Sequence, residues 1–295
     1  MSARRETRDK IVARALGLAA LLSFGTTFAI VLLLLGESVA IFTQVSLKEL
    51  LLSVRFGPML DPPAYGVWPL LAGTALVATL GLAIALPIAL IIAVYLSEYC
   101  PPRIRRVLKA ALDVLAGVPA VVYGFVALVY VSPFLQPHVA EIGVYSALAG
   151  AIVLAAMLVP YIASLADDAI YAVPLELREA GFALGASRLS VVRRAVLPHA
   201  VSGVVAACFL GVARAMGETM IVLIVCGLEP TLTLDPRAPV QTLAAFIAQA
   251  SLSDTGGTET GSRLMFFVAT MLFALTFALN AISARWRERF LRRMP

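Results

Sequence analysis

Six long apolar segments, separated by shorter polar connections, constrain this 295-residue chain more than any other feature. Each is about as long as the roughly 20 mostly apolar residues that a helix needs to cross the hydrocarbon core of a bilayer. Hydrophobic residues make up 61% of the chain and charged residues 14%, whereas soluble globular domains have roughly 45–50% and 25%. The sequence therefore predicts an all-α, polytopic membrane protein. The predicted spans cover residues 15–36, 68–96, 112–134, 144–166, 201–228 and 264–284.

Lysine and arginine are distributed unequally between alternate connections. Five lie in the N-terminal segment, 1–14, five lie in the C-terminal tail, 285–295, and four lie in each of the second-to-third and fourth-to-fifth connections. Such an excess marks the cytoplasmic side of a membrane protein. We therefore expect one six-helix transmembrane domain over 15–284, with the N-terminal segment, the tail and residues 167–198 in the cytoplasm. The net charge of +5 then reflects orientation in the membrane rather than nucleic-acid binding.

The connection between spans four and five, residues 167–198, is too charged to lie in a bilayer and predicts two short helices. Pro174 suits the first turn of a helix, acidic side chains follow it, and Gly185 suits a stop after about residue 184. Ser187 is a suitable N-cap for the second helix, which we expect to end at the break before Pro198.

The first of these helices carries small residues at Ala180, Gly181 and Ala183. A partner can approach such a surface closely, so a short helix of this kind, projecting from a membrane domain, is suited to docking. An ordinary cytoplasmic loop is the alternative interpretation, and the composition alone does not separate the two.

Charged residues inside a predicted span are the next signal. Arg214 and Glu218 lie four residues apart in the fifth span, which predicts that they share one helical face. A charge at the centre of a bilayer costs at least ~2.5–3.5 kcal/mol, so such a residue normally faces a partner or an aqueous cavity. One interpretation is a self-neutralising pair that stabilises the bundle. The other is a pathway site, in which the arginine fork binds an oxyanion and Glu218 holds the arginine or repels a second anion.

Prolines and glycines mark the less regular parts of the chain. Pro119 is expected to kink the third span. Residues 43–67 are expected to form a loop rather than a folded unit. In the long outer connection, 229–262, the segment VQTLAAFIAQAS is weakly amphipathic. It either lies on the outer surface, where it can meet an external partner, or belongs to a solvated loop with one or two helical turns.

Several kinds of site are excluded by the sequence. The three cysteines, Cys100, Cys208 and Cys226, lack CxxC spacing, which argues against a disulfide framework or a zinc site. None of the lysines follows a glycine, so the chain has no Walker A loop, and HExxH and GxSxG are also absent. We therefore expect no catalytic residue, no metal site and no cofactor bound by this chain.

Part of the polar connection resembles a known signature. Glu179-Ala180-Gly181, Gly185 and Leu197-Pro198 lie at the intervals of the EAA-x3-G-x9-I-x-LP signature of bacterial ABC importer permeases. Gly181 replaces an alanine of that signature, and Ala195 replaces its isoleucine. Further segments between residues 66 and 252 are similar to the PstC-type subunits of bacterial phosphate importers. They include AGVPAVVYGFVALV, RAMGETMIVLIVCG and QTLAAFIAQAS.

The resemblance implies a permease subunit of the bacterial inner membrane, forming half of the translocation pathway of an ATP-driven importer for inorganic phosphate. The implied partners are a second, PstA-type permease, a homodimeric PstB-type ATPase that binds ATP and Mg, and an external phosphate-binding protein. The helix after Pro174 would be the coupling helix that fits a cleft on the ATPase. The implied coupling residues are Glu179, Ala180, Gly181, Gly185, Leu197 and Pro198. Arg214, with Glu218, is the implied contact for phosphate in transit.

Two other functions stay open at this point. A permease for another oxyanion, such as sulfate, molybdate or phosphonate, would share the fold and the signature. A membrane scaffold or an intramembrane enzyme would need no ATPase, so the presence of an ATPase subunit in the purified complex separates it from an importer.

Overall fold

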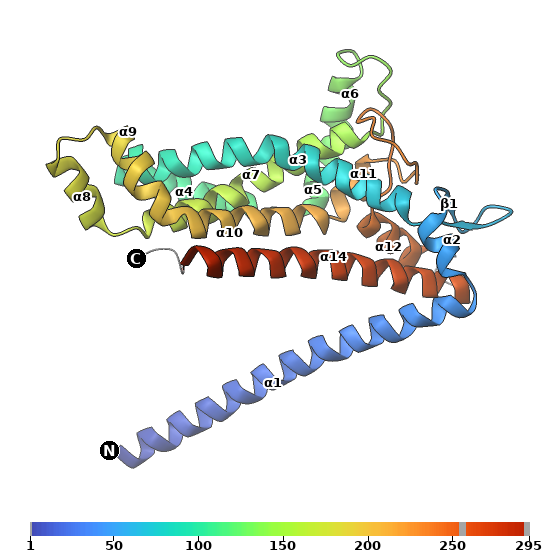
Figure 1. The fold of residues 1–295 in the computed structure, drawn as a ribbon, viewed down its shortest axis with the longest axis horizontal. Coiled ribbons are helices and arrows are strands. Elements are labelled where there is room, and N and C mark those ends of the chain that lie inside the picture. Colours follow the sequence, from blue (N-terminus) through green and yellow to red (C-terminus); the bar gives the residue numbers. More distant parts are fainter. Residues whose placement is uncertain (1, 254–257, 292–295) are drawn as a thin grey trace.

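The structure, a computed structural model, describes residues 2–253 and 258–291. The described part is helical apart from one two-stranded hairpin (Figure 1). Residues 254–257 of the predicted outer connection and 292–295 of the predicted tail lie outside the described residues. The elements are α1 Ser2–Ala40, η1 Ile41–Thr43, α2 Leu47–Leu52, β1 Phe56–Gly57, β2 Ala64–Tyr65, α3 Trp68–Val94, η2 Tyr95–Tyr99, α4 Pro102–Ala116, α5 Ala120–Val126, η3 Ala127–Val131, α6 Ser132–Leu135, α7 Ala147–Tyr171, α8 Leu175–Ala183, α9 Arg188–Val191, η4 Val192–Val196, α10 Leu197–Met216, α11 Met220–Val225, α12 Leu243–Leu252 and α14 Glu259–Leu291.

The long helices agree with the predicted membrane segments. Within the described residues, five helices are long and apolar enough to cross a membrane, and a bent pair formed by α4 and the helices after it is a sixth candidate. Three segments are π-helical: η3 and η4 continue directly from one helix into the next, whereas η2 extends α3 and ends at the extended residue Cys100. In Figure 1, α1 begins and α14 ends at the end of the molecule where α8 and α9 lie.

The third predicted span, 112–134, is not one continuous helix. Helix α4 ends at Ala116, α5 begins at Ala120, and the two directions differ by 85°. The break lies at Pro119, where a kink was predicted, but the helix ends there and the chain turns sharply. Pro119 lacks an N–H and disfavours helical backbone at Val118, and Gly117 caps α4, so three successive residues favour the end of the helix.

The fifth predicted span, 201–228, is also interrupted. Helix α10 ends at Met216, Gly217 caps it, and α11 begins only at Met220. At its other end, α10 continues without a break from α9 through η4, so residues 188–216 form one candidate span. The span is therefore displaced toward the N-terminus relative to the prediction.

Helix α7 forms the centre of the bundle. Of the residues in the apolar stretch of α7, 61% are buried, whereas 0% are buried in the apolar stretch of α1. Small residues let neighbouring helices approach α7 closely. A Cβ added at Gly81 of α3 would lie 3.1 Å from Leu154, and one at Gly211 of α10 would lie 2.5 Å from Ile162. Ser146 starts the helix by accepting a hydrogen bond from the N–H of Ala149 at 3.2 Å.

Helix α1 runs apart from the bundle over most of its length and approaches α14 near its C-terminal end (Figure 1). There the Thr270 hydroxyl donates a hydrogen bond to the Leu34 carbonyl at 3.1 Å. The described side chains of α1 are exposed over its long apolar stretch, which suits a helix whose surroundings are lipid or another membrane chain.

Two segments of the outer end are more ordered than the sequence predicts. Residues 43–67 contain α2 and an antiparallel pair of strands, in which Phe56 faces Tyr65. The segment predicted as a surface piece or a solvated loop forms α12, whose residues Leu243, Ala245 and Phe246 are buried. The rings of Phe56 and Phe246 meet edge to face, with centroids 4.8 Å apart. The prediction for the second segment is wrong, because α12 packs against α3, α11 and α14 and is not solvated. Residues 43–67 contain short elements but no separate folded unit, in agreement with the prediction.

Candidate functional site

The two interrupted helices pack against each other through α5 and α11. A Cβ added at Gly124 of α5 would lie 2.8 Å from the Ile224 side chain and 3.3 Å from the carbonyl oxygen of Met220. A larger residue at this position would separate the helices. Glycine therefore allows the backbone of α5 to contact α11 and brings the two breaks, at residues 117–119 and 217–219, into one region of the molecule.

Tyr123 of α5 reaches back across the first of these breaks. Its hydroxyl donates a hydrogen bond to the Leu115 carbonyl at 3.1 Å and so satisfies a backbone acceptor in the last turn of α4. With its half-buried ring and this hydrogen bond, Tyr123 is a packed residue whose hydroxyl serves the backbone.

Arg214 lies in the last turn of α10, where the carbonyl end of a helix favours a cation. Its guanidinium lies over the ring of Tyr161 of α7, 4.7 Å from the centroid. Among the described residues, no carboxylate lies within ion-pair distance of Arg214. Stacking uses the face of the guanidinium, whereas its N–H groups point outward in its plane. The exposed Arg214 side chain can therefore still bind an anion through these donors.

The four-residue spacing predicted that Glu218 shares a helical face with Arg214, and this prediction is wrong. It lies in the break after α10, and its Oε1 accepts hydrogen bonds from the N–H groups of Met220 at 3.1 Å and Ile221 at 3.3 Å. Glu218 thus caps the start of α11 with its carboxylate. The prediction fails because Gly217 ends the helix before the second residue of the pair is reached. The interpretation of a self-neutralising Arg214–Glu218 pair is therefore wrong.

The polar connection forms the two helices that the sequence predicts. Helix α8 covers Leu175–Ala183, and Gly185 follows it with a φ of +74°. The N–H of Ala186 bonds to the Gly181 carbonyl at 3.2 Å and that of Gly185 to the Phe182 carbonyl at 2.9 Å, which is the glycine-terminated C-cap. Ser187 caps α9 by accepting a hydrogen bond from the N–H of Ser190 at 3.4 Å. Local capping therefore determines this loop.

Two of the predicted coupling residues have a different setting from the one expected. Pro198 does not end the second helix, because it lies in the first turn of α10, after a π-helical stretch, where its missing N–H is tolerated. Gly181 faces its own chain, since a Cβ there would lie 2.8 Å from Val191. Glu179 and Ala180 are exposed, as a docking surface requires, whereas the neighbouring Leu197 is half-buried.

An ion pair between Arg178 and Glu98 attaches α8 to the end of α3. Nη2 of Arg178 lies 2.8 Å from Oε1 of Glu98, and the two side chains are 13% and 7% exposed. This pair could not be predicted from the sequence, because its members are 80 residues apart and only the packing of η2 beside α8 brings them together.

A second set of charges joins α4 to α7. Arg105 lies 2.7 Å from the fully buried carboxylate of Asp167, and Lys109 lies 2.8 Å from Asp168. The predicted polar connection begins at Asp167, but the structure places this residue in α7, where the ion pair balances its charge. The exposed side chains of α4 are largely apolar, among them Val107 and Val114. Two of its four cations, Arg105 and Lys109, hold the helix against the bundle.

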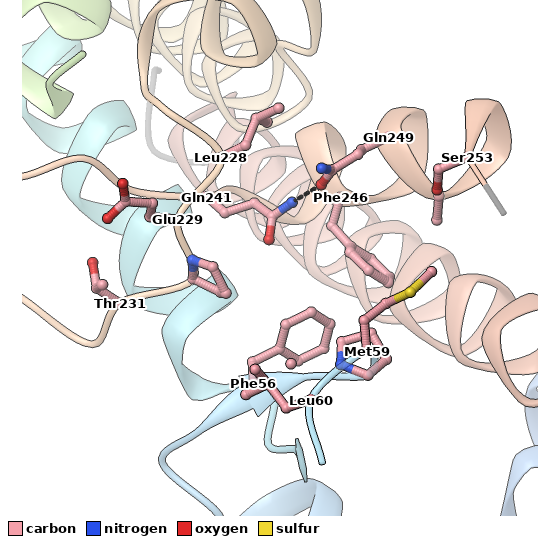
Figure 2. A pocket seen from close by; sticks show the side chains of 14 residues that line it. Phe56, Met59, Leu60, Leu228, Glu229, Thr231, Gln241, Phe246, Gln249 and Ser253 are labelled. Atoms are coloured by element: carbon pink, nitrogen blue, oxygen red, sulfur yellow. Dashed lines mark hydrogen bonds between the residues drawn. The ribbon is translucent and has the colours of Figure 1, made fainter. Parts of the chain in front are cut away.

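A cavity of about 460 Å³ lies at the outer end. Figure 2 shows Phe56, Met59 and Leu60 of the hairpin region on one side of it. On the other side, the Gln241 amide donates a hydrogen bond to Gln249. The lining of the cavity is mostly apolar, and the one charged side chain in this lining is the carboxylate of Glu229. This chemistry does not suit an anion, so the region of the helix breaks remains the better candidate for a pathway site.

Comparison with known families decides the class of the molecule. Residues 85–294, most of the chain, match the family described as binding-protein-dependent transport system inner membrane component. The chain belongs to this family. The permease is therefore an inner-membrane transport component and not an enzyme, as its motifs predicted. Membership also implies a substrate-binding protein and an ATPase as partners.

Several similar proteins carry more specific names. The probable ABC transporter permease protein YqgH of Bacillus subtilis (strain 168) is 34% identical over 244 residues, covering 82% of this chain and 78% of that protein. The phosphate transport system permease protein PstC of Xylella fastidiosa (strain Temecula1) is 34% identical over 240 residues, covering 74% and 72%. PstC 2 of Mycobacterium bovis is 33% identical over 283 residues, covering 87% and 86%.

Solved structures support the fold. An inward-facing structure of the MetNI methionine ABC transporter superposes with a TM-score of 0.56 at 21% sequence identity, covering 76% of this permease and 94% of that chain. An amino acid ABC transporter crystallised with histidines gives a TM-score of 0.54 at 18% identity. The helical arrangement therefore resembles that of these transporter structures.

Proposed function

We propose that this permease carries inorganic phosphate as the PstC-type half of an ATP-driven importer. The observation that carries the proposal is Arg214, a membrane-embedded arginine with no carboxylate in ion-pair distance among the described residues. A permanently charged guanidinium in this setting favours an anionic substrate. The phosphate permeases among the similar proteins support the choice of anion.

Tyr161 and the break after α10 prepare Arg214 for this role. The aromatic ring favours the guanidinium position seen here, 4.7 Å from the ring centroid, through a cation–π contact. Two parallel N–H groups of the fork then fit two oxygens of a tetrahedral oxyanion. Glu218 serves this site indirectly, because its cap fixes the start of α11 beside the arginine.

ATP hydrolysis would reach the pathway through the coupling helix α8. Leu184, at its C-terminal end, is 88% exposed, and Phe182 and Leu175 are exposed as well. These exposed apolar side chains lie outside the predicted membrane segments, as expected for a helix that inserts into a cleft of an ATPase subunit. The continuous helix from Arg188 to Met216 then joins this end of the molecule to Arg214.

Transport would follow from two arrangements of the bundle, one open to each side of the membrane. A bound nucleotide and a loaded binding protein shift the equilibrium between them, because each binds one arrangement better than the other. The rigid residues 188–216 would change position as one body, so movement of α8 would displace Arg214 at the far end.

Uptake of labelled phosphate tests the substrate. The permease is purified with its partner permease and ATPase, reconstituted in vesicles and supplied with ATP and the binding protein. We expect uptake of phosphate that excess unlabelled phosphate inhibits and equal concentrations of sulfate, molybdate or phosphonate do not. Inhibition by one of these anions at lower concentration would assign the permease to that anion, and absence of an ATPase in the purified complex would exclude the importer.

A further inference from the structure

Arg178 holds three parts of the chain together with one guanidinium. Besides the ion pair with Glu98, its Nη2 donates a hydrogen bond to the Ile170 carbonyl at 2.9 Å, and its Nη1 donates to the Val173 carbonyl. These carbonyls belong to the C-terminal end of α7 and the residues directly after it. Arg178 therefore connects the coupling helix α8 to the ends of both α3 and α7.

The receiving side of this contact is the π-helical segment η2, Tyr95–Tyr99. Glu98 lies in it, with a side chain only 7% exposed. The polar connection, residues 167–198, is called the coupling loop below. Its second helix, α9, reaches the same segment, because the guanidinium of Arg188 lies over the Tyr99 ring, 5.6 Å from its centroid. Both helices of the loop thus contact one turn at the end of α3.

Helices α10 and α3 depend on the coupling loop in different ways. Helix α10 continues from α9 without a break, so it follows the loop through the peptide chain itself. Helix α3 has no such connection, since it precedes α8 by a whole helical hairpin. Within the described residues, Arg178–Glu98 is the only ion pair between the coupling loop and the α3–η2 segment.

We propose that Arg178 and Glu98 are positioning residues that make α3 move with the coupling helix, so that ATP hydrolysis displaces both α3 and α10. This inference rests on the proposed ATP-driven function and adds the route by which α3 is reached. Removal of one partner leaves the other charge buried and uncompensated, which loosens the contact more than loss of an exposed pair does. The exposed docking surface of α8 stays unchanged.

The test measures phosphate taken up per ATP hydrolysed by the complete reconstituted complex. Arg178→Gln and Glu98→Gln are each expected to retain the ATPase subunit and to lower this ratio about tenfold. Coupling between two sites in a protein typically changes an affinity by ~5–150-fold. Arg263→Gln, which removes the Arg263–Glu259 pair at the outer end, is the matched control and should keep the wild-type ratio. A wild-type ratio in both α3-contact variants, or loss of the ATPase from them, would overturn the proposal.

A covalent replacement separates coupling from folding. Glu98→Cys with Arg178→Cys, in a chain whose Cys100, Cys208 and Cys226 are replaced by alanine, is joined by a short bifunctional thiol reagent. The untreated double variant should have a low ratio, and the same preparation should recover it after cross-linking, because a mechanical connection needs no charge. A ratio that stays low in the cross-linked protein would contradict the proposal.

The two proposals fail in different ways. A wild-type complex that transports sulfate instead of phosphate refutes the substrate, and the contact is then measured with sulfate per ATP. A wild-type complex without an ATPase refutes the importer and the contact together. Only normal coupling of the variants beside a transporting wild-type protein refutes the contact alone.

Discussion

At the scale of the residue, Arg214 and Glu218 have separate roles. The arginine stacks on Tyr161, and the glutamate caps α11 through two backbone N–H groups. Neutralising either Arg214 or Glu218 therefore does not leave the other charge without its partner. The pathway and the helix start become two independent contributions to the function and stability of the permease.

The double variant tests this independence. Glu218→Gln should lower stability by about 1 kcal/mol, the usual effect of a weakened helix cap. The effects of Arg214→Gln and Glu218→Gln should add to within ~0.5 kcal/mol, as measured by thermal unfolding of the purified complexes. A buried ion pair would behave differently, with each single variant losing ~3–5 kcal/mol and the double variant recovering most of it. Such recovery would contradict the assignment.

At the scale of the element, the coupling loop is a unit built from local signals. Gly185 ends α8 because its φ of +74° suits glycine, and Ser187 starts α9 with a side-chain cap. The apolar residues at the end of α8 face outward instead of packing on the loop. Their exposure is explained if an ATPase covers them in the assembled transporter.

Leu184→Asp tests this docking surface. A buried charge at the interface should weaken binding of the ATPase by about 2 kcal/mol, or roughly 30-fold in Kd. The ATPase should then be lost during purification, while the variant inserts into the membrane at the wild-type level. The control is Leu234→Asp. Leu234 is 82% exposed, similar to the 88% of Leu184, but it lies in the predicted outer connection, away from α8. Equal retention of the ATPase by both variants would place the docking surface elsewhere.

The local signals explain which parts of the structure the sequence predicts. Apolar runs define the six membrane segments, and caps define α8 and α9, because each needs information from only a few neighbouring residues. The failures have long-range causes. Arg178 and Glu98 meet only after two helices pack, and α12 is buried by α3, α11 and α14 as well as by Phe56 of the hairpin. The break before Glu218 was readable in principle, from Gly217, but the four-residue spacing suggested a continuous helix.

At the scale of the whole molecule, both ends of the described chain and the coupling loop lie at one end of the bundle (Figure 1). This arrangement is the one that the distribution of lysine and arginine predicts for the cytoplasmic side. The hairpin, α12 and the outer cavity lie at the opposite end, where a binding protein would deliver its substrate.

Thiol labelling in intact cells tests this orientation. Ser187→Cys, in a chain without its three native cysteines, should resist a membrane-impermeant reagent and react once the membrane is opened. Leu234→Cys in the outer connection should react in both conditions, because its side chain is 82% exposed. Labelling of Ser187→Cys from outside intact cells would invert the topology.

Phosphate uptake by Arg214 variants, normalised to assembled complex, tests the central claim most directly. Arg214→Gln should assemble with its partners and reduce uptake roughly 10- to 150-fold, because a hydrogen-bonded charge contributes roughly 1.5–3 kcal/mol. Arg214→Lys should be impaired as well, since an ammonium keeps the charge but lacks the planar fork that stacks on Tyr161. Uptake by Arg214→Gln close to that of the wild-type complex would contradict the account.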